Sequence, residues 1–594
     1  MREFAAPTTW DVPLVGNLTD DVVDNADQYG DQVAFSRREG AGWADVTWAE
    51  FLADVTAAAK GLLAAGVEVG DRVALVSKTR YAWTVLDYAI WFAGAVTVPV
   101  YETSSAEQIG WILADSGAML ALAETPAHLA RITEAAARLP DLRRTVCIDA
   151  GDLERLVAAG ADVTDATVDE RRAAVTPDSL ASLIYTSGTT GRPKGCRLTH
   201  GNFMAEVGVA TRELHDLFEV EGASTLLFLP LAHVFARVIS VGCVRARVRV
   251  GHTADVQHLV DDLAAFRPTF ILAVPRVFEK VFNTASGRAA SDGKGRVFDA
   301  AVSTAIAYSQ AQDRRGPGVL LRGRHAMFDR LVYVRLRAAL GGKLQYAVSG
   351  GAPLGERLAH FYRGAGVPIL EGYGLTETTA ALTVNLPAAQ RIGTVGRPLP
   401  GTTVRVADDG ELLFFGDQVF EGYWRDDAAT QESLVDGWLH TGDVGEMDDD
   451  GYVRITGRLK EILVTAGGKN VAPAVLEDRV RAHPLVSQCM VVGDGRPFVA
   501  ALVTLDAEAA QDWLATRNRA GTVADLVHDR EARADVQLAV DDANASVSRA
   551  EAIRTFAIVD RDWTEETGEL TPTLKLKRSL VLRRFHDEVE ALYH

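Results

Sequence analysis

The sequence predicts an α/β protein with a large N-terminal domain of parallel sheets covered by helices, followed by a small, mobile α+β C-terminal domain. Short apolar segments alternate with helical patterns through the first half of the chain. Hairpin signals replace this alternation after residue 390, and a compact α+β pattern follows residue 460. Fully apolar strands separated by helices are typical of parallel sheets buried on both faces. A chain of 594 residues is expected to form two or more domains.

The alternation begins with a helix. Thr47 and Glu50 have the spacing of a capping box, and Phe51, Val55 and Leu62 then fall on one helical face. A second helix is expected at 82–94. Apolar strands are expected at 72–77, 95–101, 119–123, 145–149, 183–187, 225–229, 270–274 and 344–348.

A β-subdomain is expected over about 390–456. Its signals are the turn dipeptides Asp409-Gly410 and Asp450-Gly451, each between alternating apolar residues. We place the main domain boundary at Lys460, which gives an N-terminal domain of residues 1–459 and a C-terminal domain of residues 460–594. The C-terminal domain is expected to contain a helix near 473–483 and strands near 487–493, 497–504 and 553–559.

Composition and charge narrow the functional classes. Asp and Glu total 80 against 61 Lys and Arg, a net charge of −19, which disfavours nucleic acid as a partner. The four cysteines form no metal-binding pair and suggest a reducing compartment. The N-terminus has no apolar run of signal-peptide length, and the apolar stretch 225–244 contains Pro230, His233 and Arg237. We therefore expect a cytoplasmic protein without a transmembrane segment. Peripheral membrane contact through a local patch remains compatible with this charge.

The stretch YTSGTTGRPKG at 185–195 is typical of a loop that binds phosphate, and it is expected to follow an apolar strand and to precede a helix that begins near Thr199. Glycines expose backbone N–H groups, hydroxyls donate hydrogen bonds, and Lys194 supplies a positive charge. The spacing differs from a Walker A loop, in which four residues separate the glycines and lysine follows the second glycine directly. Here two residues separate Gly188 from Gly191, and two more precede Lys194. The candidate phosphate ligands are Thr186, Ser187, Gly188, Thr189, Thr190, Gly191 and Lys194.

Four further motifs follow in order: YGLTET at 373–378, WLHTGD at 438–443, TGRLKE at 456–461, and a lysine in LTPTLKLKR at 570–578. Together with the loop, they resemble the signature of the adenylate-forming superfamily, which contains acyl-CoA synthetases, luciferases and peptide-synthetase adenylation domains. The resemblance spans nearly the entire chain. It implies that ATP activates a carboxylic acid as an acyl-adenylate, with release of pyrophosphate.

The resemblance also assigns roles to individual residues. Glu377 is implied as the ligand of Mg²⁺, which prefers oxygen ligands. Tyr373 offers an aromatic face for adenine, and Asp443 can accept hydrogen bonds from both ribose hydroxyls. Arg458 is implied to contact ribose or phosphate. The remaining implied nucleotide contacts are Gly350, Gly351, Ala352, Gly374 and Thr376.

The C-terminal lysine is implied to stabilise negative charge between the carboxylate and the α-phosphate. The family context is Gly-Lys-apolar-x-Arg, and here Leu574 replaces the glycine. Aligning the apolar residue and the basic cluster selects Lys575, and Lys577 is the competitor. The pattern LTPT-x-K-L-x-R resembles the long-chain fatty acyl-CoA synthetase branch.

The second half-reaction replaces AMP with a thiol, and the resemblance implies that the C-terminal domain rotates between the two steps. Lys460 occupies the hinge position. Gly467 and Gly468 are implied to enter the site after rotation, where they allow close approach of the pantetheine arm of coenzyme A.

A long-chain fatty acid is the expected substrate, because the segments 228–237, 274–280 and 369–379 resemble the long-chain branch. Coenzyme A is the expected acceptor, and the alternative within the family is a fatty acyl-AMP ligase that serves a separate carrier protein. The spacing at 185–195 disfavours a P-loop nucleotide hydrolase. The presence of Glu377, Asp443 and Lys575 disfavours a catalytically silent lipid-binding relative.

Overall fold

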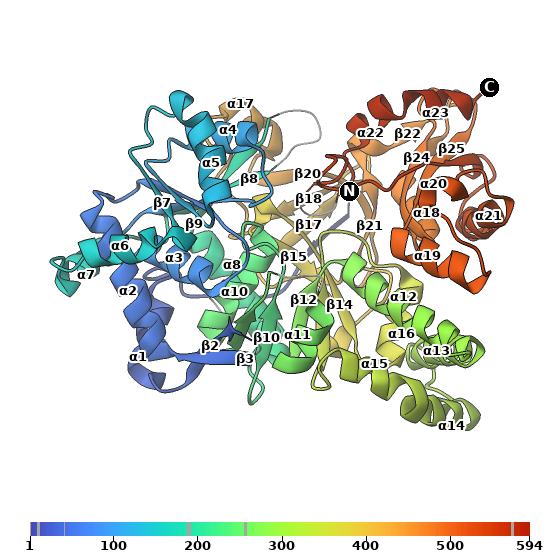
Figure 1. The fold of residues 1–594 in the computed structure, drawn as a ribbon, viewed down its shortest axis with the longest axis horizontal. Coiled ribbons are helices and arrows are strands. Elements are labelled where there is room, and N and C mark those ends of the chain that lie inside the picture. Colours follow the sequence, from blue (N-terminus) through green and yellow to red (C-terminus); the bar gives the residue numbers. More distant parts are fainter. Residues whose placement is uncertain (1, 9–11, 41, 187–191, 255–257, 572–574) are drawn as a thin grey trace.

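The computed structural model describes residues 2–8, 12–40, 42–186, 192–254, 258–571 and 575–594. Two large sheets and their helices form the N-terminal part, and the C-terminal residues form a separate α/β unit beside it (Figure 1). The predicted fold class is therefore confirmed. In the described part of the chain, every helix is too short or too polar to span a bilayer.

The larger sheet has nine strands among the described residues. It is parallel from β14 to β2, and β15 and β3 pair antiparallel near its two ends. Its order is β16 (Arg397–Pro398), β15 (Ala380–Val384), β14 (Ile369–Leu375), β13 (Tyr346–Ser349), β12 (Phe270–Ala273), β10 (Ser224–Leu227), β11 (Arg249–His252), β2 (Val33–Glu39) and β3 (Gly42–Thr47).

The second sheet has six described strands and is parallel except at one edge, where β9 runs antiparallel to β8. Its order is β7 (Arg144–Cys147), β6 (Leu120–Ala123), β4 (Arg72–Val76), β5 (Val96–Val100), β8 (Leu180–Thr186) and β9 (Lys194–Thr199). The eight strands predicted from the apolar segments are all present in these two sheets, and the sequence did not predict β2, β3, β9, β11, β14, β15 and β16.

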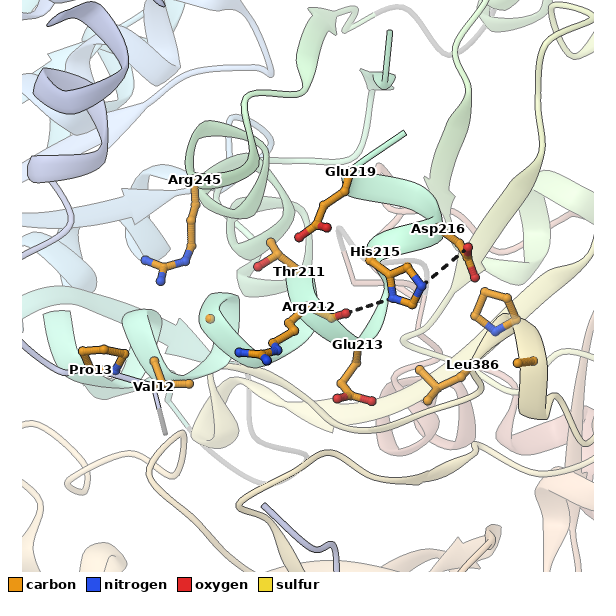
Figure 2. Close-up of a pocket in the computed structure, with 13 residues that line it drawn as sticks. Val12, Pro13, Thr211, Arg212, Glu213, His215, Asp216, Glu219, Arg245 and Leu386 are labelled. Carbon is orange, nitrogen blue, oxygen red and sulfur yellow. Dashed lines mark hydrogen bonds and ion pairs between the residues drawn. The ribbon is translucent and has the colours of Figure 1, made fainter. Parts of the chain in front are cut away.

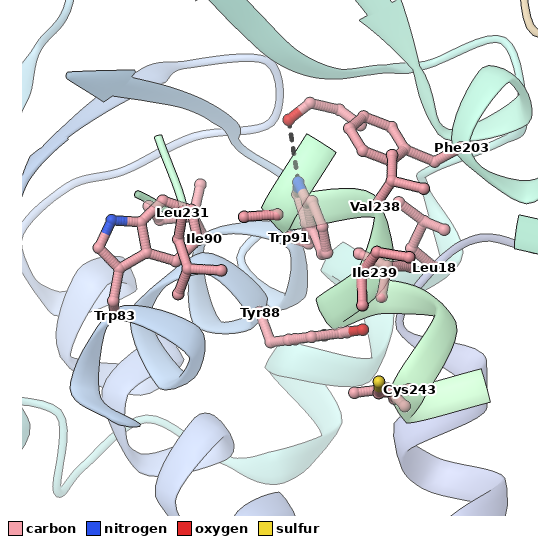
Figure 3. Packing of buried hydrophobic residues seen from close by; sticks show 14 of the residues in the cluster. Leu18, Trp83, Tyr88, Ile90, Trp91, Phe203, Leu231, Val238, Ile239 and Cys243 are labelled. Carbon is pink, nitrogen blue, oxygen red and sulfur yellow. Dashed lines mark hydrogen bonds between the residues drawn. The ribbon is translucent and has the colours of Figure 1, made fainter. Parts of the chain in front are cut away.

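One hydrophobic cluster joins the two sheets, because it contains strand residues of both. The helices that contribute to it are α1 (Asp20–Tyr29), α2 (Trp48–Ala64), α3 (Tyr81–Phe92), α8 (His200–Glu213) and α10 (Val234–Ala246). Figure 3 shows Trp83, Tyr88 and Trp91 of α3 beside Phe203 of α8 and Cys243 of α10. The predicted capping box at Thr47 is present at the start of α2.

A buried ion pair lies inside this cluster. Arg237 of α10 donates from Nε to Oδ2 of Asp87 on α3 at 2.8 Å, and its Nη1 donates to the hydroxyl of Ser182 on β8. Asp87 also accepts from Thr97 of β5 at 2.7 Å. The pair therefore ties two central helices to the sheet that leads into the segment predicted to bind phosphate.

The opposite faces of the sheets are also covered. Helices α4 (Ala106–Ser116) and α5 (Pro126–Ala135) pack on the six-stranded sheet. On the nine-stranded sheet the cover consists of α11 (Leu259–Phe266), α12 (Pro275–Ser291), α13 (Gly295–Gln312), α14 (Val319–Phe328), η3 (Asp329–Tyr333), α15 (Val334–Ala339) and α16 (Glu356–Gly364).

The expected β-subdomain is an antiparallel sheet whose path is β1 (Arg2–Ala5), β17 (Thr403–Val406), β18 (Glu411–Phe415), β20 (Trp438–Met447) and β19 (Leu434–Val435). The strand β21 (Val453–Arg458) pairs with β20. Gly410 and Gly451 both have a positive φ in the predicted turns. The N-terminal strand β1 pairs with β17, which sequence analysis did not predict.

The C-terminal residues form a three-stranded sheet of β24 (Val486–Val492), β25 (Val499–Leu505) and β26 (Ile553–Ile558) with its own hydrophobic cluster. The helices of that cluster are α18 (Pro473–Arg481), α19 (Ala507–Thr516), α20 (Val523–Leu526) and α21 (Arg530–Asn544). The chain ends in α22 (Arg578–Arg584) and α23 (His586–Ala591). The helix and strands predicted from the sequence are all present, and the boundary at Lys460 stays a prediction.

Candidate functional site

The segment predicted to bind phosphate begins at the end of β8 and ends at the start of β9, two strands that pair antiparallel. Thr186, the last residue of β8, pairs with Lys194, the first residue of β9. The predicted ligands Ser187, Gly188, Thr189, Thr190 and Gly191 lie outside the described residues, and their roles stay predictions. Sequence analysis expected the loop to lead toward a helix near Thr199. The structure inserts β9 first, and Thr199 then caps α8 by accepting from the N–H of Asn202 at 3.1 Å.

A segment near residue 423 packs alongside this hairpin. Trp424 donates its N–H to the carbonyl of Gly195 at 2.7 Å, and Cys196 forms an isolated bridge with Tyr423. The Tyr423 ring centroid lies 5.1 Å from Nζ of Lys194, a cation–π contact. Tyr423 therefore fixes the position of the predicted phosphate-binding lysine.

The same tyrosine holds Glu377. Its hydroxyl donates to Oε1 of Glu377 at 2.8 Å, and the N–H of Phe420 donates to the Glu377 carbonyl at 2.8 Å. Sequence analysis missed Tyr423, because nothing local in the Gly-Tyr-Trp run indicates a partner so distant in the chain. Lys194 and Glu377 thus converge on one tyrosine.

Strained backbone sets the direction of the Glu377 turn. Glu377 lies in the short helix η4 (Thr376–Thr378) between β14 and β15, and Thr379 and Ala380 follow with φ of 53° and 97°. Such values are costly for residues with a side chain and persist where the surroundings enforce them. A Cβ on Gly374 would lie 1.4 Å from the Ala380 carbonyl oxygen. Gly374 is therefore required by the close approach of the two strands that carry Glu377.

A second cluster of side chains consists of Tyr373, Asp443 and Arg458, and we call it the Asp443 group. The Tyr373 hydroxyl donates to Oδ2 of Asp443 at 2.6 Å, and Nε of Arg458 donates to Oδ1 at 2.7 Å. Asp443 is buried, and it pairs with Arg458 across β20 and β21. Burial and the adjacent Asp443 carboxylate raise the pKa of Tyr373 well above its ordinary value. Each carboxylate oxygen of Asp443 retains a lone pair that can accept from a ribose hydroxyl.

The glycine segment follows β13. Gly350 is buried, and a Cβ there would lie 3.0 Å from the Phe235 ring, while Gly351 has φ of +81°. Gly351 and Ala352 are exposed. A bare backbone at this strand end is compatible with a flat ring system approaching it closely.

Lys575 comes to the same place from the C-terminal part. Lys575 is exposed, yet desolvation by the surrounding protein lowers the pKa of its ammonium group. The Arg458 guanidinium lowers this pKa further, and the carboxylates of Asp443 and Glu377 oppose the shift. The positive charge of Lys575 therefore acts between the Asp443 group and Glu377.

Lys577, the alternative candidate for the functional lysine, has different neighbours. Its N–H donates to the Glu569 carbonyl at 2.8 Å, and its own carbonyl accepts from Leu580 at the start of α22. The backbone of Lys577 thus anchors a helix end. The electrostatic contacts with Asp443 and Glu377 favour Lys575 as the functional lysine.

Gly467 and Gly468 lie in the turn between β22 (Leu463–Val464) and β23 (Asn470–Val471). Both are exposed, and Gly468 has φ of +74°. This hairpin packs on a neighbouring turn, where Ala466 donates its N–H to the carbonyl of Arg496 at 2.8 Å. Lys460 is exposed in the short helix η6 (Leu459–Glu461). The structure therefore brings Lys575 to the predicted site and leaves the Gly467–Gly468 turn on the surface.

Helix α12 docks the C-terminal part in this orientation. Nη2 of Arg276 lies 3.0 Å from Oδ2 of Asp506 and 3.3 Å from the Ser487 hydroxyl. One turn further along α12, Lys280 lies 3.7 Å from a carboxylate oxygen of Glu508 on α19. These polar contacts are compatible with an interface that can open and close.

The side chain of Glu377 is the predicted ligand of Mg²⁺. The described residues contain no group of three or more His, Cys, Asp or Glu side chains able to hold a metal ion. Within the described residues no hydrogen bond reaches Oε2 of Glu377, whereas Oε1 is held by Tyr423. A single carboxylate ligand fits a Mg²⁺ ion whose other ligands are phosphate and water.

A separate open pocket of about 840 Å³ lies at the end of α8 and beside α9 (His215–Phe218) (Figure 2). None of the predicted site residues lines it. Arg212, Glu213, Glu219 and Arg245 do, and such a charged lining is unlike an apolar acyl tunnel.

Comparison with known proteins places these features in a family. Residues 22–424 match the family model described as AMP-binding enzyme, and residues 460–594 match that of the AMP-binding enzyme C-terminal domain. The long-chain-fatty-acid–CoA ligases FadD15 of Mycobacterium bovis and Mycobacterium tuberculosis are each 51% identical to this chain over 599 residues, covering all of both chains.

Solved structures share the fold. The adenylation domain of a carboxylate reductase from Mycobacterium chelonae has a TM-score of 0.74 at 23% identity, covering 97% of this chain and 91% of its own. The anthranilate CoA ligase AuaEII in complex with anthranoyl-AMP has a TM-score of 0.73 at 19% identity, covering 98% of this chain and 99% of its own. At these identities the two structures support the fold alone.

Proposed function

Because this chain belongs to the AMP-binding enzyme family, we propose that it is an AMP-forming long-chain fatty acid–CoA ligase. The observation that carries the proposal is the convergence of Lys575, Glu377 and Asp443 from three distant segments. Identity of 51% over the full length of two long-chain-fatty-acid–CoA ligases supports the same activity.

In the first step a carboxylate oxygen of the fatty acid attacks the α-phosphorus of ATP. The bond to the bridging oxygen breaks, pyrophosphate leaves, and an acyl-adenylate forms. Negative charge builds up on the α-phosphate oxygens as the two anions approach each other. Lys575 stabilises that charge, because its ammonium group already lies within electrostatic range of Asp443 and Glu377 and needs no further reorganisation.

The nucleoside end is bound by the Asp443 group. Tyr373 and Arg458 hold the Asp443 carboxylate from two sides, so that its remaining lone pairs are directed to the ribose hydroxyls. The Tyr373 ring and the Gly350–Gly351 backbone flank the place proposed for adenine.

The pyrophosphate end is bound by the β8–β9 hairpin. Thr186 and Lys194 stand opposite each other at its base, and Lys194 supplies charge to the β- and γ-phosphates. Oε2 of Glu377 would hold Mg²⁺, with Thr376 beside it in the same short helix. Bound there, Mg²⁺ would neutralise phosphate charge and favour pyrophosphate as the leaving group.

In the second step the thiol of coenzyme A attacks the acyl carbon, and AMP leaves. Lys575 interacts electrostatically with Asp443 and Glu377 in the present orientation, so we propose a rotation about Lys460 that withdraws it. The exposed Gly467–Gly468 turn is then free to approach the thiol substrate with bare backbone.

A product assay tests the proposal. The purified protein is incubated with ATP, Mg²⁺ and palmitate, with and without coenzyme A, and all products are identified by mass. AMP, pyrophosphate and palmitoyl-CoA in the complete mixture are expected. Palmitoyl-AMP that persists in the presence of coenzyme A would instead indicate a carrier protein as acceptor, and ADP with phosphate would refute the adenylation chemistry.

A further inference from the structure

Helix α14 and its continuation through η3 and α15 expose an apolar stripe. Val319 and Leu320 are 84% and 87% exposed, and Met327, Leu331 and Val334 are also exposed. Leu320, Met327, Leu331 and Val334 recur at intervals of seven, four and three residues, which places them along one side of the helix. We call this side, with its flanking arginines, the α14 face. Figure 1 shows α14 at the outer edge of the molecule.

The opposite side of the same segment is fixed in the core. Phe328, Tyr333 and Leu336 are buried, and the Tyr333 hydroxyl donates to the Ala301 carbonyl at 2.7 Å. His325 lies with Nε2 2.7 Å from the Gly364 carbonyl oxygen. The outward direction of the apolar stripe therefore follows from firm packing on α13 and α16.

Positive charge surrounds the stripe, in contrast to the rest of the chain. Residues 313–337 contain seven arginines and two aspartates, whereas the whole chain has a net charge of −19. Arg337 pairs with Asp329 at 2.7 Å, and Arg363 holds Asp313 at 2.6 Å. Six exposed arginines of this segment have no ion pair within the described part of the chain: Arg314, Arg315, Arg322, Arg324, Arg330 and Arg335.

We propose that the α14 face docks on a membrane surface that contains anionic phospholipids. A helix with exposed apolar side chains along one side and arginines beside them is suited to lie in the plane of a lipid interface. The apolar side chains enter the acyl region, and the arginines pair with lipid phosphates. An acidic protein is repelled by an anionic bilayer elsewhere on its surface, so the α14 face also determines its orientation.

A second copy of the chain fits this face less well. In a symmetric dimer the same patch meets itself, which would bring Arg330 and Arg335 of the two copies together in one desolvated interface. An anionic lipid surface supplies the opposite charge. The inference goes beyond the proposed function, and binding can be measured without turnover.

Vesicle co-sedimentation tests the proposal with the full-length protein. Vesicles of equal phosphatidylglycerol and phosphatidylcholine are compared with vesicles of phosphatidylcholine alone. We expect binding to the first, weak binding to the second, and weaker binding to the first at high salt, because salt screens the arginines.

Two double variants separate the contributions of positive charge and of apolar burial to vesicle binding. Arg330→Glu with Arg335→Glu should reduce the partition coefficient by at least about 25-fold, since each basic residue contributes a factor of about five near an anionic surface. Leu320→Ser with Leu331→Ser should reduce it by at least about tenfold through lost apolar burial. The matched control is Leu538→Ser with Arg530→Glu, both exposed on α21, which should bind as the unmodified protein does.

Several outcomes would overturn the proposal. Equal binding by the unmodified protein and both α14-face variants would place the contact elsewhere. Absence of binding to anionic vesicles, with normal formation of palmitoyl-CoA from dispersed palmitate, would refute the membrane surface and leave the proposed function intact. A dimer that dissociates when Leu320 and Leu331 are changed, measured by light scattering, would assign the face to a second copy.

Discussion

Tyr423→Phe isolates one hydrogen bond in the proposed site. The change removes the hydroxyl that donates to Oε1 of Glu377 at 2.8 Å and keeps the ring that lies 5.1 Å from Nζ of Lys194. Lys194 should therefore stay in place. Glu377 should gain freedom to rotate away from the position in which its other oxygen would hold Mg²⁺.

The size of the effect follows from the charge of the acceptor. A hydrogen bond to a charged group contributes about 1.5–3 kcal/mol, and each 1.36 kcal/mol changes a rate by about tenfold. The Phe420 N–H still holds the Glu377 backbone, so only the side chain is released. We expect adenylate formation to slow by about tenfold at low Mg²⁺, near the lower end of that range, and to recover in part as Mg²⁺ is raised.

Two half-reactions are compared in the assay. Pyrophosphate exchange measures adenylate formation over a range of Mg²⁺ concentrations, and conversion of supplied palmitoyl-AMP to palmitoyl-CoA measures the second step. The second step should be unchanged. Tyr452→Phe is the matched control, because its hydroxyl donates to the Ala389 carbonyl at the same 2.8 Å but outside the site. An unchanged Mg²⁺ dependence in Tyr423→Phe would refute the positioning role.

Three further changes test the lysine, the docking interface and the core. Lys575→Ala should slow adenylate formation at least about a hundredfold, as expected for loss of a preorganised charge, and the variant should still convert supplied palmitoyl-AMP to palmitoyl-CoA. Lys577→Ala should leave both half-reactions near normal. The reverse result would make Lys577 the functional lysine. Because the pKa of Lys575 is lowered, the charged form is lost as pH rises toward the lysine range, so adenylate formation should fall at a lower pH than for an ordinary lysine. Arg276→Ala removes the contact with Asp506. It should slow adenylate formation by about two- to fivefold, which corresponds to the free energy that one ion pair near the surface contributes, and should leave the rate of the second step unchanged. Equal loss in both steps would contradict a docking role for Arg276. Asp87→Ala leaves Arg237 buried without its ion-pair partner and should lower the free energy of unfolding by about 3–5 kcal/mol. The loss is measured as a lower urea midpoint of the N-terminal part. An unchanged midpoint would show that the ion pair contributes nothing to stability.

The apolar segments of the sequence predict eight strand positions, because a strand buried on both faces of a parallel sheet is apolar along most of its length. β12 is apolar throughout, and β4 is apolar after Arg72. The turn at Gly410 and the capping box at Thr47 are equally local, because each depends on a few adjacent residues. The order of the five motifs was sufficient to indicate the adenylate-forming family.

Other features depend on how distant segments pack. The residues around Lys194 predicted a loop that leads into a helix, but Lys194 pairs with Thr186 and therefore lies in β9. Pairing of β1 with β17 had no local signal, because the two strands lie at opposite ends of the N-terminal part. Motif alignment selected Lys575 but left Lys577 as a competitor, and the electrostatic interactions of Lys575 with Asp443 and Glu377 in the folded chain favour the first.

The sequence by itself determined the α/β class and the positions of eight buried strands, which follow from periodicity, and its five motifs indicated ATP-driven activation through their resemblance to the adenylate-forming superfamily. The tertiary structure decided that Tyr423 joins Lys194 to Glu377, and that one side of α14 is left uncovered among unpaired arginines. Such contacts join residues far apart in the chain. Their energies depend on distance and burial, which only the packing of the sheets and helices sets.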